Sequence, residues 1–249
     1  MSEPVVYAVA EGVATITLNR PESRNALNSA MCEGLARAAT SAAADESVRV
    51  VFVRAKGPVF CAGADLKERQ GMNEDQVRAR RLKAFAAYDA LERLPMPAIA
   101  VVHAAAVGSG CEIAAACDFI VATPEASFRT PEALWGTVGA TQRLPRVLGK
   151  RLAKDLMFTG RTLPVAEAQA AGLVSRVVPA EGLDQVLAEI AKTIVAAPPG
   201  ALRLAKRCID RGVELDPRGA LATELLAIEE NLAAADWRAG IVGFGGSKT

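Results

Sequence analysis

Hydrophobic residues recur along this chain in short β-rich runs that are separated by longer stretches of mixed character. The short runs predict strands at 5–10, 13–19, 48–55, 98–102 and 118–122. The longer stretches predict helices at 28–44, 74–94 and 108–116. Glu11-Gly12 lies between the first two strands and is typical of a hairpin turn. Buried strands that alternate with helices indicate an α/β fold with a parallel sheet.

The pattern changes after Lys150, where helices predominate. One short strand is expected at 174–178, and helices are expected at 151–158, 165–171, 182–196, 201–210 and 217–235. Pro198-Pro199-Gly200 indicates a linker, and residues 244–249 are typical of a frayed tail. We therefore expect a core over residues 1–197 and a C-terminal helical region over 198–249.

Composition and charge exclude several classes of protein. The chain has 249 residues, of which 51% are hydrophobic and 23% charged, so it is not intrinsically disordered. Its net charge of +1 gives no support for binding to nucleic acid or to a membrane surface. The longest apolar stretch, 98–108, is about half the length of a membrane span. The N-terminus lacks a basic, apolar secretory pattern, and we expect a cytoplasmic protein.

Cysteine and histidine usage argues against a disulfide framework and against metal chemistry. The five cysteines are odd in number and have no Cys-x-x-Cys spacing, which favours free thiols in a reducing compartment. His103 is the one histidine, and it follows a predicted buried strand. A zinc site or a Ser-His-Asp triad would have to be built around it, so we expect no metal.

Two glycine-containing junctions carry candidate binding chemistry. Residues 60–67 follow one predicted buried strand, and residues 107–112 open a helix after another. Exposed backbone N–H groups at such junctions bind anions or polarised carbonyls, and two of them could form an oxyanion hole. A tight turn with Asp65 as a local cap also explains the first junction. In the second, Gly108 and Gly110 give only part of a dinucleotide motif, because Ile113 takes the third glycine position; we expect no nicotinamide cofactor.

Glu112 and Glu132 are candidates for general acid and base catalysis, because they place two carboxyl groups on different loops. Each also has a simpler explanation. Glu112 is an acid in the first turn of a helix, where the helix dipole favours it. Glu132 is an acid next to a turn.

The order of these motifs resembles the crotonase (enoyl-CoA hydratase/isomerase) superfamily over residues 5–244. The resemblance rests on Asn19-Arg20-Pro21-Glu22, Asn25-Ala26-Leu27, 61–67, 108–112, Pro131-Glu132, 141–146, Gly149-Lys150, 159–161 and 166–174. It implies a crotonase-like α/β spiral of ββα repeats, followed by a helical C-terminal oligomerisation region. It also implies a homotrimer or a dimer of trimers.

The resemblance further implies an enoyl-CoA hydratase that acts on an acyl-CoA thioester and needs no separate cofactor. The thioester carbonyl would accept hydrogen bonds from the backbone N–H groups of Ala64 and Ser109. Glu112 would activate water, and Glu132 would transfer the α-carbon proton. Contacts to CoA are expected from Ala62, Gly63, Asp65, Leu66, Lys67, Gly108 and Gly110.

Two positions depart from the superfamily pattern. Ser109 stands where glycine is usual, and the loop at 136–140, beside Trp135, is about three residues short. Because that loop lines the acyl pocket in the superfamily, its shortening is expected to reshape the pocket.

Alternative functions are another superfamily reaction (Δ3-Δ2 isomerisation, decarboxylation or C–C hydrolysis) and a non-catalytic binding or RNA-binding role. The basic cluster of Arg78, Arg80, Arg81 and Lys83 is expected to form a solvated helix face or a rim for CoA phosphate. A net charge of +1 and few aromatic residues argue against an RNA-stacking surface.

Overall fold

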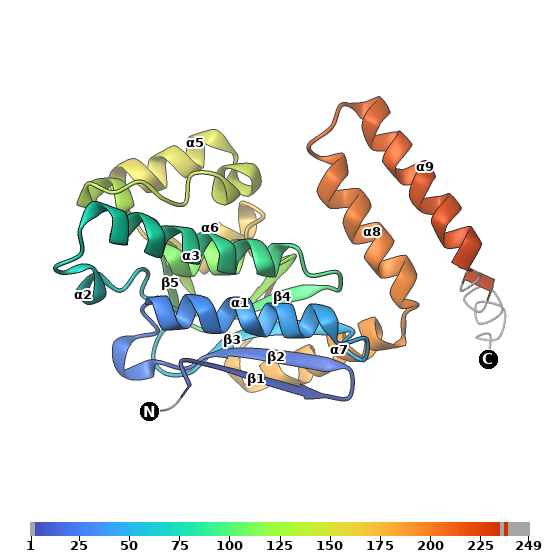
Figure 1. Ribbon diagram of the computed structural model, residues 1–249, viewed down its shortest axis with the longest axis horizontal. Coiled ribbons are helices and arrows are strands. Elements are labelled where there is room, and N and C mark those ends of the chain that lie inside the picture. Colours follow the sequence, from blue (N-terminus) through green and yellow to red (C-terminus); the bar gives the residue numbers. More distant parts are fainter. Residues whose placement is uncertain (1–2, 235–236, 239–249) are drawn as a thin grey trace.

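A six-stranded sheet forms the base of the molecule in the computed structural model, which describes residues 3–234 and 237–238 (Figure 1). Its strand order is β1-β2-β3-β4-β6-β9. β1 and β2 form the predicted antiparallel hairpin, and the remaining pairs are parallel. The strands are β1 (Val5–Ala10), β2 (Val13–Leu18), β3 (Val50–Ala55), β4 (Ala98–Val102), β6 (Phe119–Ala122) and β9 (Arg176–Val177).

A second, three-stranded sheet was not predicted from the sequence. It consists of β5 (Ala105–Val107), β7 (Ser127–Arg129) and β8 (Leu163–Pro164) in the order β5-β7-β8. Strands of two or three residues are too short to show an alternating pattern. β4 continues into β5 and then α4 (Ser109–Ala115), and β6 continues into β7 ahead of α5 (Arg143–Thr159). This succession is the spiral of ββα repeats that the resemblance implied.

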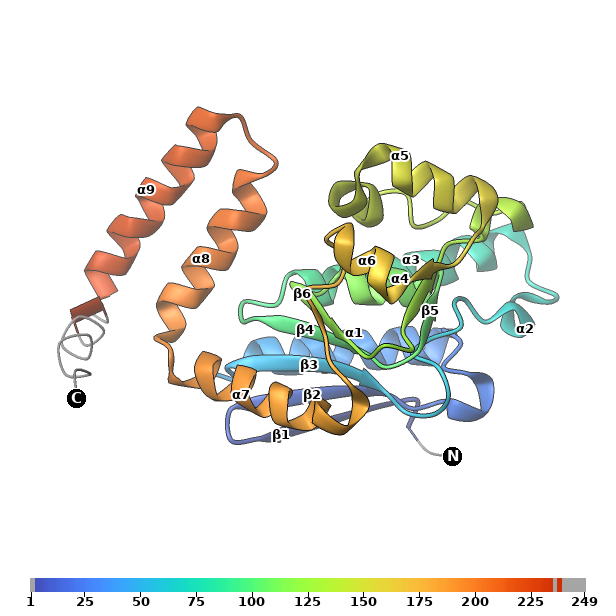
Figure 2. The ribbon, with the colours of Figure 1, turned by 180° about the vertical axis from the view of Figure 1, so that it is seen from behind.

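Helices cover both faces of the large sheet, and each strand sends alternate side chains to opposite faces. Val51 and Val53 of β3 pack into a cluster with α1 (Ser29–Ala44) and α3 (Glu74–Glu92). Val50 and Phe52 pack into a second cluster with α7 (Leu183–Ala196). Figure 2 shows α7 along the face of the sheet opposite α1.

The helix predictions hold for α1, α3, α4 and α7 to within a few residues at each end. The prediction at 151–158 matches the part of α5 that follows its kink at Gly149, but the helical segment before the kink, which begins at Arg143, was missed. Pro145 lies in the first turn of this segment, where proline is tolerated in a helix. Gly149 adopts a φ of +73° and kinks the helix. Two short helices complete the core: α2 (Leu66–Arg69) and α6 (Val165–Ala170).

α8 (Pro199–Gly212) and α9 (Pro217–Ala234) form a helical hairpin that stands away from the sheets (Figure 1). The predicted boundary at 197/198 falls between α7 and α8, and the division into two units stays a prediction. The predicted tail at 244–249 lies outside the described residues. No helix in the described part of the chain has the length and apolar character of a membrane span. The hairpin exposes large apolar side chains, namely Ile209, Val213, Leu215, Leu221, Leu225, Leu226, Ile228 and Leu232.

Candidate active site

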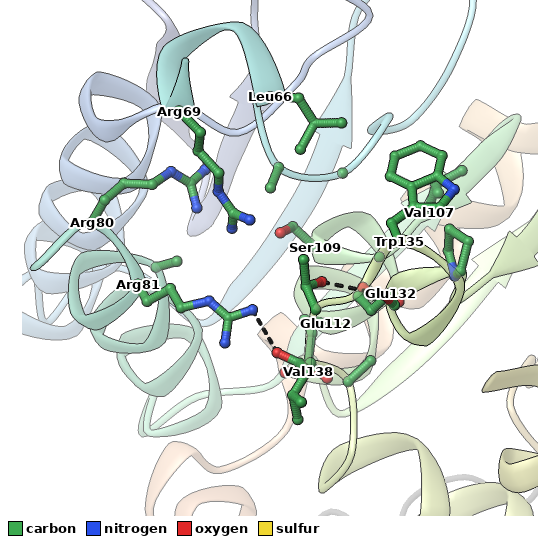
Figure 3. Close-up of a pocket in the computed structure, with 18 of the residues that line it drawn as sticks. Leu66, Arg69, Arg80, Arg81, Val107, Ser109, Glu112, Glu132, Trp135 and Val138 are labelled. Carbon is green, nitrogen blue, oxygen red and sulfur yellow. Dashed lines mark hydrogen bonds between the residues drawn. The ribbon is translucent and has the colours of Figure 1, made fainter. Parts of the chain in front are cut away.

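The two glycine-containing junctions, α3 and the segment 131–140 meet around one pocket (Figure 3). The structure therefore brings together residues that lie far apart in the sequence. Eight of the predicted site residues line this pocket: Ala62, Gly63, Ala64, Leu66, Gly108, Ser109, Glu112 and Glu132.

The backbone N–H of Ala64 is left without a hydrogen-bond partner because the residues on either side of it pair with Leu27 as in a β-bridge. Leu27 and Ala64 form an isolated parallel bridge, in which the N–H of Leu27 donates to the carbonyl of Gly63 at 2.7 Å. The N–H of Asp65 donates to the carbonyl of Leu27 at 3.0 Å. In this register the N–H of Ala64 points away from Leu27. It has no hydrogen-bond partner among residues 3–234 and 237–238.

A second free donor is the N–H of Ser109, at the start of α4. Gly108 donates its own N–H to the carbonyl of Arg129 at 2.8 Å, and the carbonyl of Gly108 accepts from Glu112 at 3.1 Å. The N–H of Ser109 is one of the first-turn donors that a helix leaves unpaired. A Cβ atom at Gly63 would lie 4.0 Å from the nitrogen of Ser109, so the two junctions abut. Two backbone donors thus open side by side onto one pocket.

Glu132 lies directly over Gly108. A Cβ atom at Gly108 would come within 2.5 Å of the Oε1 atom of Glu132, and one at Gly139 would lie 3.4 Å from its Cγ atom. The absence of side chains at these two glycines therefore makes room for the carboxyl group. Its Oε2 atom is buried and has no hydrogen-bond partner in the described structure.

Glu112 reaches the pocket from the first turn of α4 and is 5% exposed. Its Oε2 atom accepts a hydrogen bond from the Nη1 atom of Arg143 at 3.0 Å. Its Oε1 atom is buried and, within the described residues, unpaired. Buried carboxyl oxygens normally have a partner. Each glutamate thus presents one oxygen that a water molecule or a substrate could satisfy.

The surroundings of the two carboxyl groups push them towards different protonation states. Burial raises the pKa of Glu112, and the Arg143 guanidinium opposes that rise. Burial also raises the pKa of Glu132, and the nearby Glu112 carboxylate raises it further, against Arg81 and Arg69. Two close carboxyl groups do not both ionise easily. The ion pair with Arg143 favours ionised Glu112 and protonated Glu132.

Arg143 is a part of the site that the sequence did not single out. Its guanidinium also binds the Oε2 atom of Glu92, with the Nε atom at 3.1 Å, and lies 5.7 Å from the centre of the Tyr88 ring. In the sequence it belongs to the 141–146 motif, which gives no sign of a partner for it. Its position opposite Glu112 depends on how α5 packs against α4, which no local pattern reveals.

Three predicted CoA-binding residues lie outside the pocket lining. Asp65 caps α2 by accepting from the N–H of Lys67 at 3.1 Å, and it forms an ion pair with Arg20 at 3.0 Å. Lys67 is exposed on α2. Gly110 packs against Cys61, whose carbonyl oxygen would lie 2.6 Å from an added Cβ atom. The structure gives Asp65 and Gly110 local structural roles, and their contact with CoA stays a prediction.

The prediction that the basic residues of α3 form a solvated helix face is wrong for Arg80. Arg78 and Lys83 are exposed, but Arg80 is only 3% exposed. Its Nε atom donates to Glu68 at 3.1 Å, and its Nη2 atom donates to the carbonyl of Leu27. The signal was its spacing from Ala84, which lies one turn further along the buried stripe of the helix.

Cysteine and histidine lie outside this chemistry. Five free cysteines occur in the structure, and four of them are buried. The Nε2 atom of His103 lies 2.8 Å from the carbonyl oxygen of Gly57, a contact that ties a strand end to a loop. In the described part of the chain no three His, Cys, Asp or Glu side chains are grouped as metal ligands would be.

Comparison with known proteins agrees with this geometry. The sequence model of the family described as enoyl-CoA hydratase/isomerase matches residues 8–247. Enoyl-CoA hydratase domain-containing protein 2, a mitochondrial protein of Bos taurus, is 40% identical over 246 residues, which cover 94% of this chain and 82% of that protein.

Solved structures agree over nearly the whole chain. An enoyl-CoA hydratase from Bacillus anthracis is 37% identical, with a TM-score of 0.94 and coverage of 99% of this chain and 97% of that one. An enoyl-CoA hydratase from Mycobacterium smegmatis is 35% identical, with a TM-score of 0.93 and coverage of 97% and 95%. The spiral fold, the matched sequence and these relatives show that the chain belongs to the enoyl-CoA hydratase/isomerase family.

Proposed function

We propose that this protein is an enoyl-CoA hydratase, which adds water reversibly across the double bond of a 2-enoyl-CoA thioester. One observation carries the proposal. Two free backbone N–H groups and two buried, unpaired carboxyl oxygens open onto the same pocket. The donors suit a developing oxyanion, and the two carboxyl groups suit the base and the acid of a hydration.

In the proposed reaction the thioester oxygen accepts hydrogen bonds from the N–H groups of Ala64 and Ser109. Ionised Glu112 takes a proton from water as the water oxygen bonds to C3 of the acyl group. The π electrons pass to C2 and into the thioester, and the resulting enolate is stabilised by the two donors. Protonated Glu132 then delivers its proton to C2. In this proposal hydroxyl and proton add to the same face of the double bond, and dehydration reverses each role.

The shortened loop at 136–140 leaves Glu132 in the pocket. The N–H of Thr137 donates to the carbonyl of Glu132 at 2.9 Å, and the guanidinium of Arg81 donates to the carbonyl of Val138 at 2.5 Å. These contacts fasten the loop to the glutamate and to α3. We therefore propose that the short loop alters the shape of the acyl pocket and leaves the acid in place.

Product analysis separates hydration from isomerisation, which is the nearest alternative in the family. The purified protein would be incubated with 2-hexenoyl-CoA and, separately, with 3-hexenoyl-CoA, and the products identified by mass. A hydratase converts the 2-enoyl thioester into a species heavier by one water. Conversion of the 3-enoyl thioester without water addition to either substrate would instead support an isomerase.

Arg143→Met is expected to move the acidic limb of the pH profile of kcat/KM to higher pH. Arg143 opposes the effect of burial on Glu112, so its removal raises the pKa of that carboxyl group further. A higher pH is then needed to ionise the base. The measurement is kcat/KM for 2-hexenoyl-CoA against pH. Arg146→Met is the matched control, because Arg146 pairs with Glu214 on the surface. An unmoved limb would contradict the assignment of Glu112 as the base.

We also propose that copies of the chain associate through the α8–α9 hairpin as a trimer or a dimer of trimers. The large apolar side chains exposed on this hairpin support the proposal, because monomeric proteins rarely expose an apolar surface of this extent. Leu226→Glu, at a side chain 71% exposed, is expected to shift the mass in solution towards the monomer. Light scattering after gel filtration measures it. Arg218→Glu on the same helix should leave the mass unchanged, and a monomeric wild type would contradict the proposal.

A further inference from the structure

Three arginines form one wall of the pocket. Arg69 ends α2, and Arg80 and Arg81 lie in α3; all three line the pocket. Figure 3 shows the guanidinium group of Arg69 on the side of the pocket that faces Ser109, with Arg80 beside it, and that of Arg81 directed towards the carbonyl of Val138. The proposed hydration does not use them.

Within the described residues, one of the three has a negatively charged partner. Arg80 is paired with Glu68 at 3.1 Å. Arg69 and Arg81 form no ion pair within residues 3–234 and 237–238. Arg81 donates to the carbonyl of Val138, which leaves most of its N–H donors free. The Nε atom of Arg69 is buried and without a partner in the described structure.

Unpaired guanidinium groups in a partly buried pocket are unfavourable until an anion binds them. The carboxyl groups of the site do not serve as that anion. Glu112 is already bound to Arg143, and Glu132 makes no ion pair within the described residues. Guanidinium groups are well suited to a carboxylate, which they bind with two parallel hydrogen bonds. An oxyanion on the substrate is therefore the missing partner.

The position of the two arginines indicates which part of the substrate carries the charge. Arg81 donates to the carbonyl of Val138, and the neighbouring Gly139 lies against Glu132, since an added Cβ atom there would be 3.4 Å from the Cγ atom of Glu132. Arg69 lines the same pocket, so both arginines lie near the reacting carbons. The phosphates of CoA are separated from the thioester by the whole pantetheine arm. Ala84 and Phe85 continue the same wall with apolar surface. This arrangement favours a carboxylate at the far end of the acyl chain over a CoA phosphate.

We infer that Arg69 and Arg81 bind a terminal carboxylate of the acyl group, and that the preferred substrate is a 2-enoyl-CoA with such a carboxylate. The inference rests on the proposed function, whose substrate class it narrows. Both arginines then act as specificity-determining residues, and neither takes part in proton transfer.

The test compares two thioesters of matched shape. Glutaconyl-CoA carries the terminal carboxylate, and 5-methyl-2-hexenoyl-CoA has an isopropyl group in its place. The wild type is expected to have the higher kcat/KM for glutaconyl-CoA. Arg81→Leu and Arg69→Leu should each lower that value about 10- to 100-fold, as the loss of a charged hydrogen bond does. Neither variant should lower kcat/KM for the isopropyl substrate. Arg78→Leu is the matched control, because Arg78 is exposed and pairs with Asp75.

Three results would overturn the inference. A wild type that hydrates the isopropyl substrate but not glutaconyl-CoA would keep the hydratase and reject the carboxylate site. Equal losses on both substrates that disappear with the 3′-dephospho-CoA thioesters would assign the arginines to a CoA phosphate. If neither thioester is hydrated, the proposed function fails. The carboxylate site is then tested on its own by calorimetry, which compares the affinity of the protein for glutaryl-CoA with its affinity for hexanoyl-CoA. Equal affinity of the wild type for both would then reject the site.

Discussion

Glu112→Gln and Glu132→Gln are each expected to lower kcat for hydration by about 10²–10⁴-fold, the usual contribution of a general acid or base. Glutamine keeps the shape and the hydrogen-bonding length of glutamate, so the pocket and substrate binding should remain. Glu112→Gln removes the base that accepts the proton of water. Glu132→Gln removes the acid that supplies the proton to C2. The measurement is loss of enoyl-thioester absorbance at saturating 2-hexenoyl-CoA, with KM and thermal stability measured beside it.

The two variants also test whether the carboxyl groups act as a pair. If both belong to one mechanism, the double variant should be little slower than the slower single variant, because removing either group already blocks the shared reaction path. Retention of most activity in either single variant, with the fold intact, would remove that glutamate from the mechanism. Glu224→Gln, on the exposed α8–α9 hairpin, controls for loss of a charge far from the pocket.

Gly108→Ala is expected to lower kcat/KM by about 10²-fold, which is typical when one oxyanion-hole donor is misplaced. The added methyl group would lie 2.5 Å from the Oε1 atom of Glu132, so the carboxyl group or the backbone at Ser109 must move. The φ of +50° at this position is also unfavourable for alanine. Steady-state kinetics with 2-hexenoyl-CoA measures the loss.

Gly172→Ala is the matched control for backbone strain. Its φ is +84°, and no atom lies within 4 Å of the position where a Cβ would be added. It should lose about 1–2 kcal/mol of stability from the left-handed backbone, with little change in kcat/KM. If Gly108→Ala loses no more activity than this control, the close approach of Gly108 and Glu132 has no catalytic importance.

The large sheet and its covering helices could be predicted from the sequence because the central strands are short, continuous apolar runs and the helices between them are longer segments of mixed character. β4 is predicted with its observed bounds, 98–102, since every one of its residues is buried. β1 is also predicted with its observed bounds, 5–10. The other predicted strands are one or more residues too long, because hydrophobicity marks burial and does not mark where the hydrogen-bonded ladder ends. β9 shortens to Arg176–Val177 for that reason.

The positions of the site residues were predicted by motif order, but their partners were not. Ala64, Ser109, Glu112 and Glu132 all line the pocket, since each stands at a junction that the repeat places at the same end of the fold. The contact between Arg143 and Glu112 depends on packing between α4 and α5, which are separate in the sequence. The second sheet was missed because its strands are too short for any period.

The burial of Arg80 could not be predicted from the sequence pattern. A charged residue within a basic run is normally solvated, and its burial is stable here only because Glu68 and the carbonyl of Leu27 receive its N–H groups. Those partners come from other segments of the chain. A hydrophobicity pattern holds no information about whether such partners exist.

Hydration of 2-hexenoyl-CoA in D₂O, with the product examined by NMR, tests the central claim most directly. If Glu112 and Glu132 act on one face of a thioester held by Ala64 and Ser109, the product carries one deuterium at C2 and a hydroxyl group at C3, added syn. Under the same conditions Glu132→Gln and Glu112→Gln should form almost none of this deuterated hydroxy product. A wild type that exchanges or shifts protons without adding water, or that adds hydroxyl and deuterium to opposite faces, would contradict the account.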